Sequence, residues 1–92
     1  MAMLVRFEPT NMDAKAYAEV LRRLESRGMG TPPGRIHHAS YGDADALHVV
    51  DIWDTPENFG RFGEQLMPIL AELGVQLGAP IIRALHNVIR GG

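Results

Sequence analysis

Cysteine is absent from the 92 residues, which excludes disulfides, thiolate metal ligands and cysteine nucleophiles. No apolar run approaches the length of a membrane-spanning helix, and no basic segment followed by an apolar run marks a signal peptide. Neither sign of charge dominates, because nine basic residues accompany eleven acidic ones for a net charge of −2. Nucleic acid is therefore not an expected partner. These absences predict a cytoplasmic protein without a membrane anchor.

Hydrophobic residues make up 46% of the chain, which is ordinary for a globular protein and argues against disorder. No internal repeat, low-complexity tract or long linker divides the sequence. Residues 1–92 are therefore expected to form a single domain. A domain of this size buries only about 60% of the surface of its unfolded chain, so it is marginally stable alone.

The spacing of apolar residues predicts the order strand, helix, strand, strand, helix, strand. The expected bounds are residues 3–8, 14–27, 35–41, 47–54, 56–73 and 81–89. Asp13 and Thr55 suit helix N-caps, Pro56 suits a first helical turn, and Gly28 and Gly74 suit the ends. With right-handed crossovers, this order predicts an α+β, ferredoxin-like βαββαβ fold. Its four-stranded antiparallel sheet would carry both helices on one face.

The two middle strands are expected to form a hairpin with Asp43 and Ala44 at its tip. His38 would then lie opposite Val49, and Tyr41 opposite Ala46. A slip of one residue would reverse every face assignment. In this register, one face of the hairpin carries Ile36, His38, Ser40, Leu47, Val49, Asp51 and Trp53.

The third and fourth strands are apolar on both faces, whereas an antiparallel sheet with one wet face should alternate. In the third strand, Leu47, Val49 and Trp53 oppose Val50 and Ile52. Two helices cover only one face of a sheet, so another surface must cover the second. A second copy of the chain is the simplest cover, which predicts an obligate homodimer packed sheet against sheet.

Asp51 and Trp53 share a face of the third strand, because residues two apart in a strand point the same way. Either Trp53 is core and Asp51 a hydrogen-bonded acid, or both line a ligand cavity between sheet and helices. In the second interpretation Trp53 stacks on an aromatic ligand, and Asp51 orients the ligand or takes a proton. His38 lies on the same face and is the best candidate for a general base.

The remaining polar residues give weaker signals. His37 and His38 are adjacent in a strand and point to opposite faces, so they do not favour a metal site. Arg83 and Asn87 fall on one face of the last predicted strand, where they bind either the polar edge of a ligand or water.

The pattern Asp51-x-Trp53-Asp54-x-x-Glu57-x-Phe59-x-x-Phe62 resembles the antibiotic-biosynthesis-monooxygenase-like branch of the dimeric α+β barrel superfamily. Members of the superfamily include cofactor-free oxygenases of aromatic polyketides, haem-degrading enzymes, cyclases, isomerases and stress-responsive proteins. The resemblance implies a ligand between sheet and helices. It departs at Phe62, where many members carry a histidine, and this weakens the case for haem ligation.

Two functions are therefore expected as alternatives. The first is a monooxygenase-like enzyme that acts on a small aromatic or apolar molecule without cofactor or metal. Its catalytic residues would be His38 and Asp51, and its ligand contacts would be Trp53, Phe62, Arg83 and Asn87. The second is a non-catalytic dimer with a ligand-binding or structural role. A cavity with a polar end favours the enzyme, whereas a cavity filled by Phe59, Phe62 and Leu66 favours the alternative.

Overall fold

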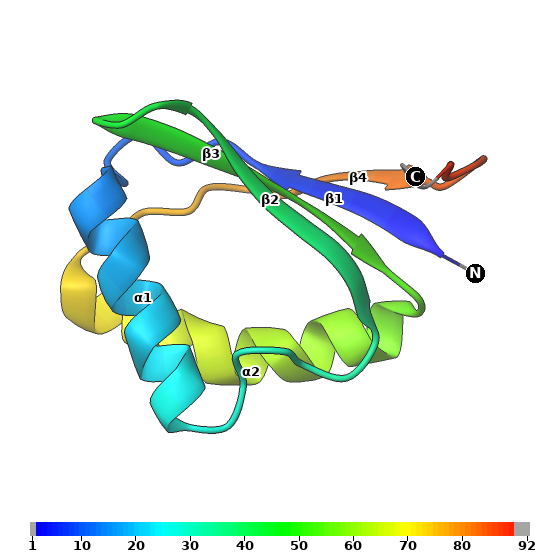
Figure 1. The fold of residues 1–92 in the computed structure, drawn as a ribbon, viewed down its shortest axis with the longest axis horizontal. Helices are drawn as coiled ribbons and strands as arrows, with labels where there is room; N and C mark the ends of the chain where they lie inside the picture. The colour runs from blue at the N-terminus through cyan, green and yellow to red at the C-terminus, as the bar shows by residue number, and fades with distance from the viewer. Residues whose placement is uncertain (1, 90–92) are drawn as a thin grey trace.

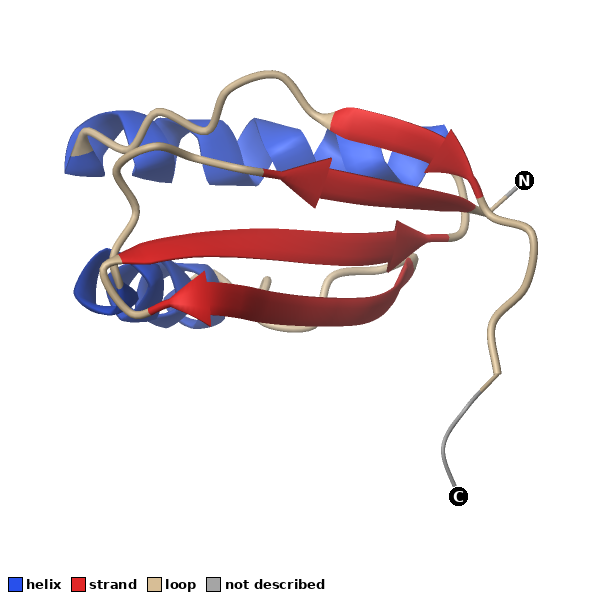
Figure 2. Cartoon of the chain, turned by 90° about the horizontal axis from the view of Figure 1, so that it is seen from above, coloured by secondary structure: helices blue, strands red, loops and turns tan. Residues whose placement is uncertain are grey.

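The computed structural model describes residues 2–89, and four antiparallel strands with two helices account for most of them. The elements are β1 (Met3–Phe7), α1 (Ala14–Ser26), β2 (Arg35–Asp43), β3 (Ala46–Trp53), α2 (Pro56–Leu73) and β4 (Ile81–Ala84). The strands form one sheet in the order β2-β3-β1-β4. Both helices lie against the same face of this sheet (Figure 1), and Figure 2 shows the strands side by side in front of them. The predicted ferredoxin-like fold is confirmed.

The residues that begin and end the helices are those that the sequence indicates. The Asp13 side chain accepts a hydrogen bond from the Ala16 backbone N–H at 2.7 Å, and Thr55 accepts one from Asn58 at 3.2 Å. Each cap satisfies a backbone donor that has no partner within its helix. Gly74 ends α2 at φ +70°, where a side chain would be strained.

The core lies between the helices and the inner face of β1 and β3. Every second residue of these strands is buried, as expected for a sheet covered on one side. Helix α2 contributes Phe62, Ile69 and Leu70 to the core, and α1 contributes Val20 and Leu24. This alternation places the inner side chains of β3 beneath the helices, where a ligand site was expected.

The hairpin is longer than predicted, and its register differs by two residues. Strand β2 continues to Asp43, which pairs with Ala46, so the turn consists of residues 44 and 45. His38 therefore pairs with Asp51 and not with Val49. The first residue of α1 contacts this turn, because the Ala14 N–H donates to the Ala44 carbonyl at 2.6 Å. A shift of two residues preserves the faces, so His38 and Asp51 still share the inner face.

Strand β2 contains an irregularity that simple alternation does not predict. Arg35 pairs with Trp53 and His37 pairs with Ile52, so two steps along β2 match one step along β3. Ile36 is the extra residue of this bulge and is 40% exposed. A bulge reverses the alternation of the residues beyond it. Arg35 consequently lies opposite an inner-face residue.

The last strand is shorter than predicted. It ends at Ala84, which pairs with Met3, the first residue of β1. Beyond Ala84, a hydrogen bond from the Leu85 N–H to the Ala2 carbonyl continues this edge. Residues 85–89 therefore have no strand to pair with in the part of the chain that the structure describes.

The outer face of the sheet carries no helix. Leu4, Val50 and Ile52 lie there and are half-buried. Tyr41, on the edge strand β2, is 38% exposed. Within residues 2–89, neither helix has the length and apolar character needed to cross a bilayer.

A charged contact joins the two helices at the surface. Arg23 bonds both Glu19 of α1 and Glu72 of α2, each at 2.7–2.8 Å. Hydrogen bonds from Arg22 and Arg23 lower the pKa of Glu19 to about 2. Glu19 thus stays charged at any pH at which the protein is normally handled.

Gly34 fixes the approach of β2 to the N-terminus of α2, and its replacement should destabilise the fold. It has φ +90°, and a Cβ atom there would lie 2.5 Å from Asp54 Oδ1 and 2.6 Å from Asn58 Cβ. We expect Gly34→Ala to lower the free energy of unfolding by about 2 kcal/mol or more, since strain and overlap add. Urea denaturation followed by circular dichroism measures the change.

Gly60→Ala is the matched control, because Gly60 is an exposed helical residue whose added Cβ meets no atom within 4 Å. We expect this variant to be about 0.5–1 kcal/mol more stable. A Gly34→Ala variant as stable as the wild type would contradict the close approach seen in the structure.

Candidate functional site

A cavity of about 50 Å³ lies between the sheet and the two helices. This is several times the minimum of about 10–15 Å³ that one water molecule needs. Eleven of the fifteen lining side chains are apolar and come from both helices, β1, β3 and the loops. The four polar lining residues are Tyr17, Arg35, His38 and Asp51. The cavity therefore has an apolar body and a polar wall on β2, β3 and α1.

Asp51 is the buried acid of this wall, with only 6% of its surface exposed. Its Oδ1 lies 2.5 Å from His38 Nδ1, and its Oδ2 accepts a hydrogen bond from Trp53 Nε1 at 3.2 Å. Burying a carboxylate is costly unless donors compensate its lost hydration. Here each oxygen has one donor, so the acid is satisfied by two side chains.

His38 is hydrogen-bonded at both ring nitrogens. Its Nε2 lies 2.6 Å from the Tyr17 hydroxyl, and the two rings stack with 11° between their planes. The Asp51 carboxylate can only accept, so His38 donates its Nδ1–H to it. Nε2 is then the acceptor of the Tyr17 O–H. Tyr17, His38 and Asp51 form a continuous chain of hydrogen bonds, and all three side chains line the cavity.

Trp53 does not line the cavity, which contradicts the expected geometry for stacking on a ligand. It is completely buried, and its ring packs against Phe62 at 5.2 Å and Phe59 at 5.7 Å between centroids. Phe59 and Phe62 line the cavity, whereas Trp53 packs against both of them and does not. Trp53 thus combines the two interpretations: it is a core residue, and it orients Asp51 through its indole N–H.

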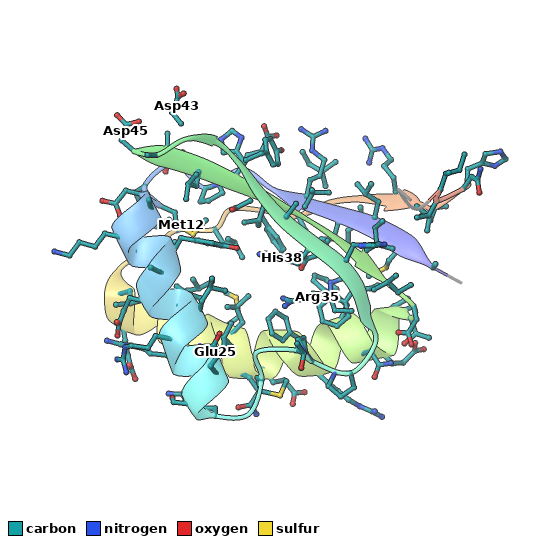
Figure 3. All side chains as sticks on the ribbon, viewed as in Figure 1. Met12, Glu25, Arg35, His38, Asp43 and Asp45 are labelled. Carbon is teal, nitrogen blue, oxygen red and sulfur yellow. The ribbon has the colours of Figure 1, made fainter. Side chains whose placement is uncertain are left out.

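Arg35 is a site residue that the sequence pattern did not reveal. Its guanidinium lies over the Phe62 ring, 5.4 Å from the centroid, and donates to the Gly30 carbonyl at 3.1 Å. Figure 3 shows Arg35 and His38 pointing into the same space between sheet and helices. Regular alternation would place Ile36 on this face, and the bulge places Arg35 there instead.

Tyr17 was also missed as a polar group, because it falls on the apolar stripe of α1, which consists of Ala14, Tyr17, Val20, Leu21 and Leu24. Its position on that stripe is what brings its hydroxyl to the cavity and to His38. The only sequence signal was that it is the sole stripe residue with a hydrogen-bonding group.

Arg83 and Asn87 lie away from the cavity. Arg83 pairs with Leu4 on the outer face, is exposed, and bonds the neighbouring Ile82 carbonyl. Asn87 follows the end of β4 and is exposed. The prediction that both lie on one face of the last strand is wrong, because β4 ends at Ala84. Of the two expected contacts, a ligand edge or water, their exposed positions fit water.

The other histidines are separate from this site. His37 is exposed, and His48 lies on the outer face with its Nδ1 3.7 Å from Glu8. Over the described residues 2–89, no group of three or more His, Asp or Glu side chains is arranged to hold a metal ion.

Comparison with known proteins gives matches in structure only. No protein-family model matches the sequence, and no curated protein matches it significantly. A proposed antibiotic biosynthesis monooxygenase from Chloroflexus aurantiacus superposes with a TM-score of 0.68 and 15% identity, over 100% of both chains. SnoaB, a cofactor-independent oxygenase from Streptomyces nogalater, superposes with a TM-score of 0.62 and 12% identity, over 98% of this chain and 96% of its own.

A third structure, a proposed antibiotic biosynthesis monooxygenase from Caulobacter crescentus, has a TM-score of 0.58 and 18% identity over 96% of this chain and 92% of its own. The chain has the antibiotic biosynthesis monooxygenase fold. The resemblance expected from residues 51–62 is thus confirmed for the fold. One fold hosts many reactions, so the chemistry of this protein depends on the residues that line its own cavity.

Asp51→Asn should move the proton of His38 from Nδ1 to Nε2. Trp53 Nε1–H needs an acceptor, so the asparagine Oδ1 should turn to it and present its NH2 to His38. His38 Nδ1 must then accept, and Nε2–H must donate to Tyr17. Nitrogen-15 NMR, at a pH where the ring is neutral, distinguishes the two tautomers.

His37 provides the internal control, because it is exposed and its neighbour Ile52 points away from Asp51. Its tautomer should be the same in both proteins. An unchanged His38 tautomer in the variant would show that Asp51 and Trp53 do not set the proton position.

Proposed function

We propose that the protein is a cofactor-independent, monooxygenase-like enzyme acting on a small aromatic or apolar molecule in the cavity. The observation that supports this most directly is the Tyr17–His38–Asp51 chain at the wall of an otherwise apolar cavity. Phe59, Phe62 and Leu66 line the cavity without filling it. A cavity with a polar end is the feature expected of the enzyme.

The proposed role of the hydrogen-bonded chain is proton removal. A ligand hydroxyl at the cavity wall gives its proton to Tyr17 Oη as the Tyr17 proton passes to His38 Nε2. Asp51 holds the opposite ring nitrogen and stabilises the imidazolium that forms. Trp53 and the pairing of β2 with β3 keep Asp51 in place, so these residues act by positioning.

Deprotonation allows an electron-rich aromatic ligand to react with dioxygen directly. For a hydroquinone, one oxygen atom forms the new ring C–O bond and the other leaves as water, giving a hydroxyquinone. All electrons that reduce dioxygen come from the ring, so the reaction needs no further reductant. The apolar walls exclude bulk water from the carbanion-like anion.

The cavity favours a small ligand. A cavity of about 150 Å³ holds benzene, and the present one has about 50 Å³. A ring therefore enters only when flexible lining side chains move. Met12, which is 3% exposed at the cavity wall, can adapt most easily because methionine is unbranched.

The test compares His38→Gln with His37→Gln, adjacent residues on opposite faces of β2. Dioxygen uptake is measured with hydroquinone and catechol, and labelled dioxygen identifies the atom inserted into the product. We expect His38→Gln to lower the rate about 100-fold, as for loss of a general base, and His37→Gln to leave it unchanged. Equal rates in both variants would reject the proton relay.

A non-catalytic ligand-binding dimer is the second candidate. The feature that favours it is that Tyr17, His38 and Asp51 already hydrogen-bond with one another, and no buried side-chain nitrogen or oxygen in the described chain lacks a partner. Ligand binding without dioxygen uptake across the panel would support this role and reject the enzyme.

We further propose that the protein forms a homodimer, sheet against sheet. The outer face of β3 and β1 presents Leu4, Val50 and Ile52 without a covering layer. Partly exposed apolar side chains on a sheet face that no other element covers are typical of an interface. A two-fold arrangement brings the same face of a second chain onto it.

Ile52→Lys should break this dimer, because burying an unpaired ammonium group costs several kcal/mol. Native mass spectrometry should give a two-chain mass for the wild type and a one-chain mass for the variant. Met67→Lys is the control, since Met67 is 55% exposed on α2 and its variant should remain dimeric. A one-chain mass for the wild type would reject the proposal.

A further inference from the structure

Arg35 places a positive charge at a cavity wall that is mostly apolar. Its side chain is half-buried between the sheet and α2, and the guanidinium rests on the Phe62 ring. One nitrogen, Nη2, donates to the Gly30 carbonyl, which is a neutral partner. No carboxylate lies within 4 Å of its nitrogens anywhere in residues 2–89.

The acid of the cavity wall does not serve as the partner of Arg35. Both Asp51 oxygens are engaged, one by His38 and the other by Trp53. Arg35 carries five N–H donors and makes one side-chain hydrogen bond within the described residues. For a guanidinium that is partly withdrawn from water in this way, hydrogen bonds to an anion are the most stabilising contacts.

We propose that the cavity binds a small organic carboxylate, with Arg35 holding its carboxylate group. This inference rests on the proposed ligand site and names the class of molecule that occupies it. A guanidinium binds a carboxylate through two parallel hydrogen bonds, which also fixes the direction of the ligand. The apolar part then lies against the leucine and phenylalanine side chains, with its far end towards Tyr17.

The charge and size of the site favour a carboxylate over a phosphate ester. Arg35 is the one permanently charged cation among the residues lining the cavity. A doubly charged phosphate would need further donors, and the remaining walls are apolar or carry the Tyr17–His38–Asp51 chain. A single negative charge on a short hydrocarbon or one-ring body matches both the wall and the small volume.

The same contact explains how a ligand could be presented to the proton relay. Arg35 and His38 both point into the cavity from β2 (Figure 3), and Tyr17 faces His38 from α1. A ligand whose carboxylate binds Arg35 therefore extends its apolar body across the cavity, towards Tyr17 and His38. Arg35 is thus a specificity-determining residue, whereas Tyr17 and His38 are the proton-transferring groups.

The experiment compares straight-chain carboxylates, from acetate to octanoate, with their uncharged primary amides. Trp53 is the only tryptophan and packs on Phe62 beneath Arg35, so its fluorescence reports binding at this site. We expect a carboxylate of fitting length to bind about tenfold or more tightly than its amide, the strength of a charge-assisted hydrogen bond.

Three arginine variants identify the residue responsible. Arg35→Gln should remove the preference for the acid, and Arg35→Lys should keep part of it, because the charge remains while the paired geometry is lost. Arg83→Gln is the matched control, because Arg83 is exposed on the outer face and should not affect binding. A preference that survives in Arg35→Gln would overturn the assignment.

The comparison of acid and amide in the wild type decides the inference even where a variant fails to fold. Equal affinities, or no binding of any acid, would overturn it. Its failure is distinguishable from failure of the proposed enzyme. Acid binding without dioxygen uptake leaves the anion site in place and removes the catalytic role, whereas dioxygen uptake with no preference for acids does the reverse.

Discussion

The burial of Asp51 is the constraint on which the rest of the site depends. A carboxylate in the core is tolerated because Trp53 and His38 each give it a donor. Those donors come from the same strand and from the neighbouring strand, so the β2–β3 register must place His38 opposite Asp51. His38 in turn presents its second nitrogen to α1. One buried charge therefore ties the sheet pairing to the position of a helix.

The elements of the fold could be predicted because each rests on local chemistry. Asp13 and Thr55 cap helices, Gly28 and Gly74 end them, and apolar spacing distinguishes helix from strand. The shared face of His38, Asp51 and Trp53 was also predictable, since it survives a register shift of two residues. These properties depend on residues that are close together in the sequence.

The features that could not be predicted depend on contacts between distant parts of the chain. The hairpin tip is held by the start of α1, where the Ala14 N–H donates to the Ala44 carbonyl. The end of β4 is set by the first residue of β1. The position of Trp53 behind Phe62, which removes it from the cavity wall, is set by the packing of α2 on the sheet. None of these partners is identifiable from residue spacing.

The similarity to the antibiotic biosynthesis monooxygenases is a similarity of fold. At 12–18% identity to the structures compared, the fold alone does not define the chemistry of the site. The groups that project into it here are a tyrosine, a histidine, an aspartate and an arginine. The scaffold supplies the volume, and these four side chains determine what can occupy it.

The bulge at Ile36 has a consequence for how such a cavity can change. The bulge decides whether Arg35 or Ile36 faces inwards. If β2 paired with β3 in regular alternation, Ile36 would face the cavity and Arg35 would face away from it, with no change of sequence. The pairing at this strand end therefore sets the electrostatic character of the cavity, and two homologues with the same residues, one with the bulge and one without it, would favour ligands of different charge.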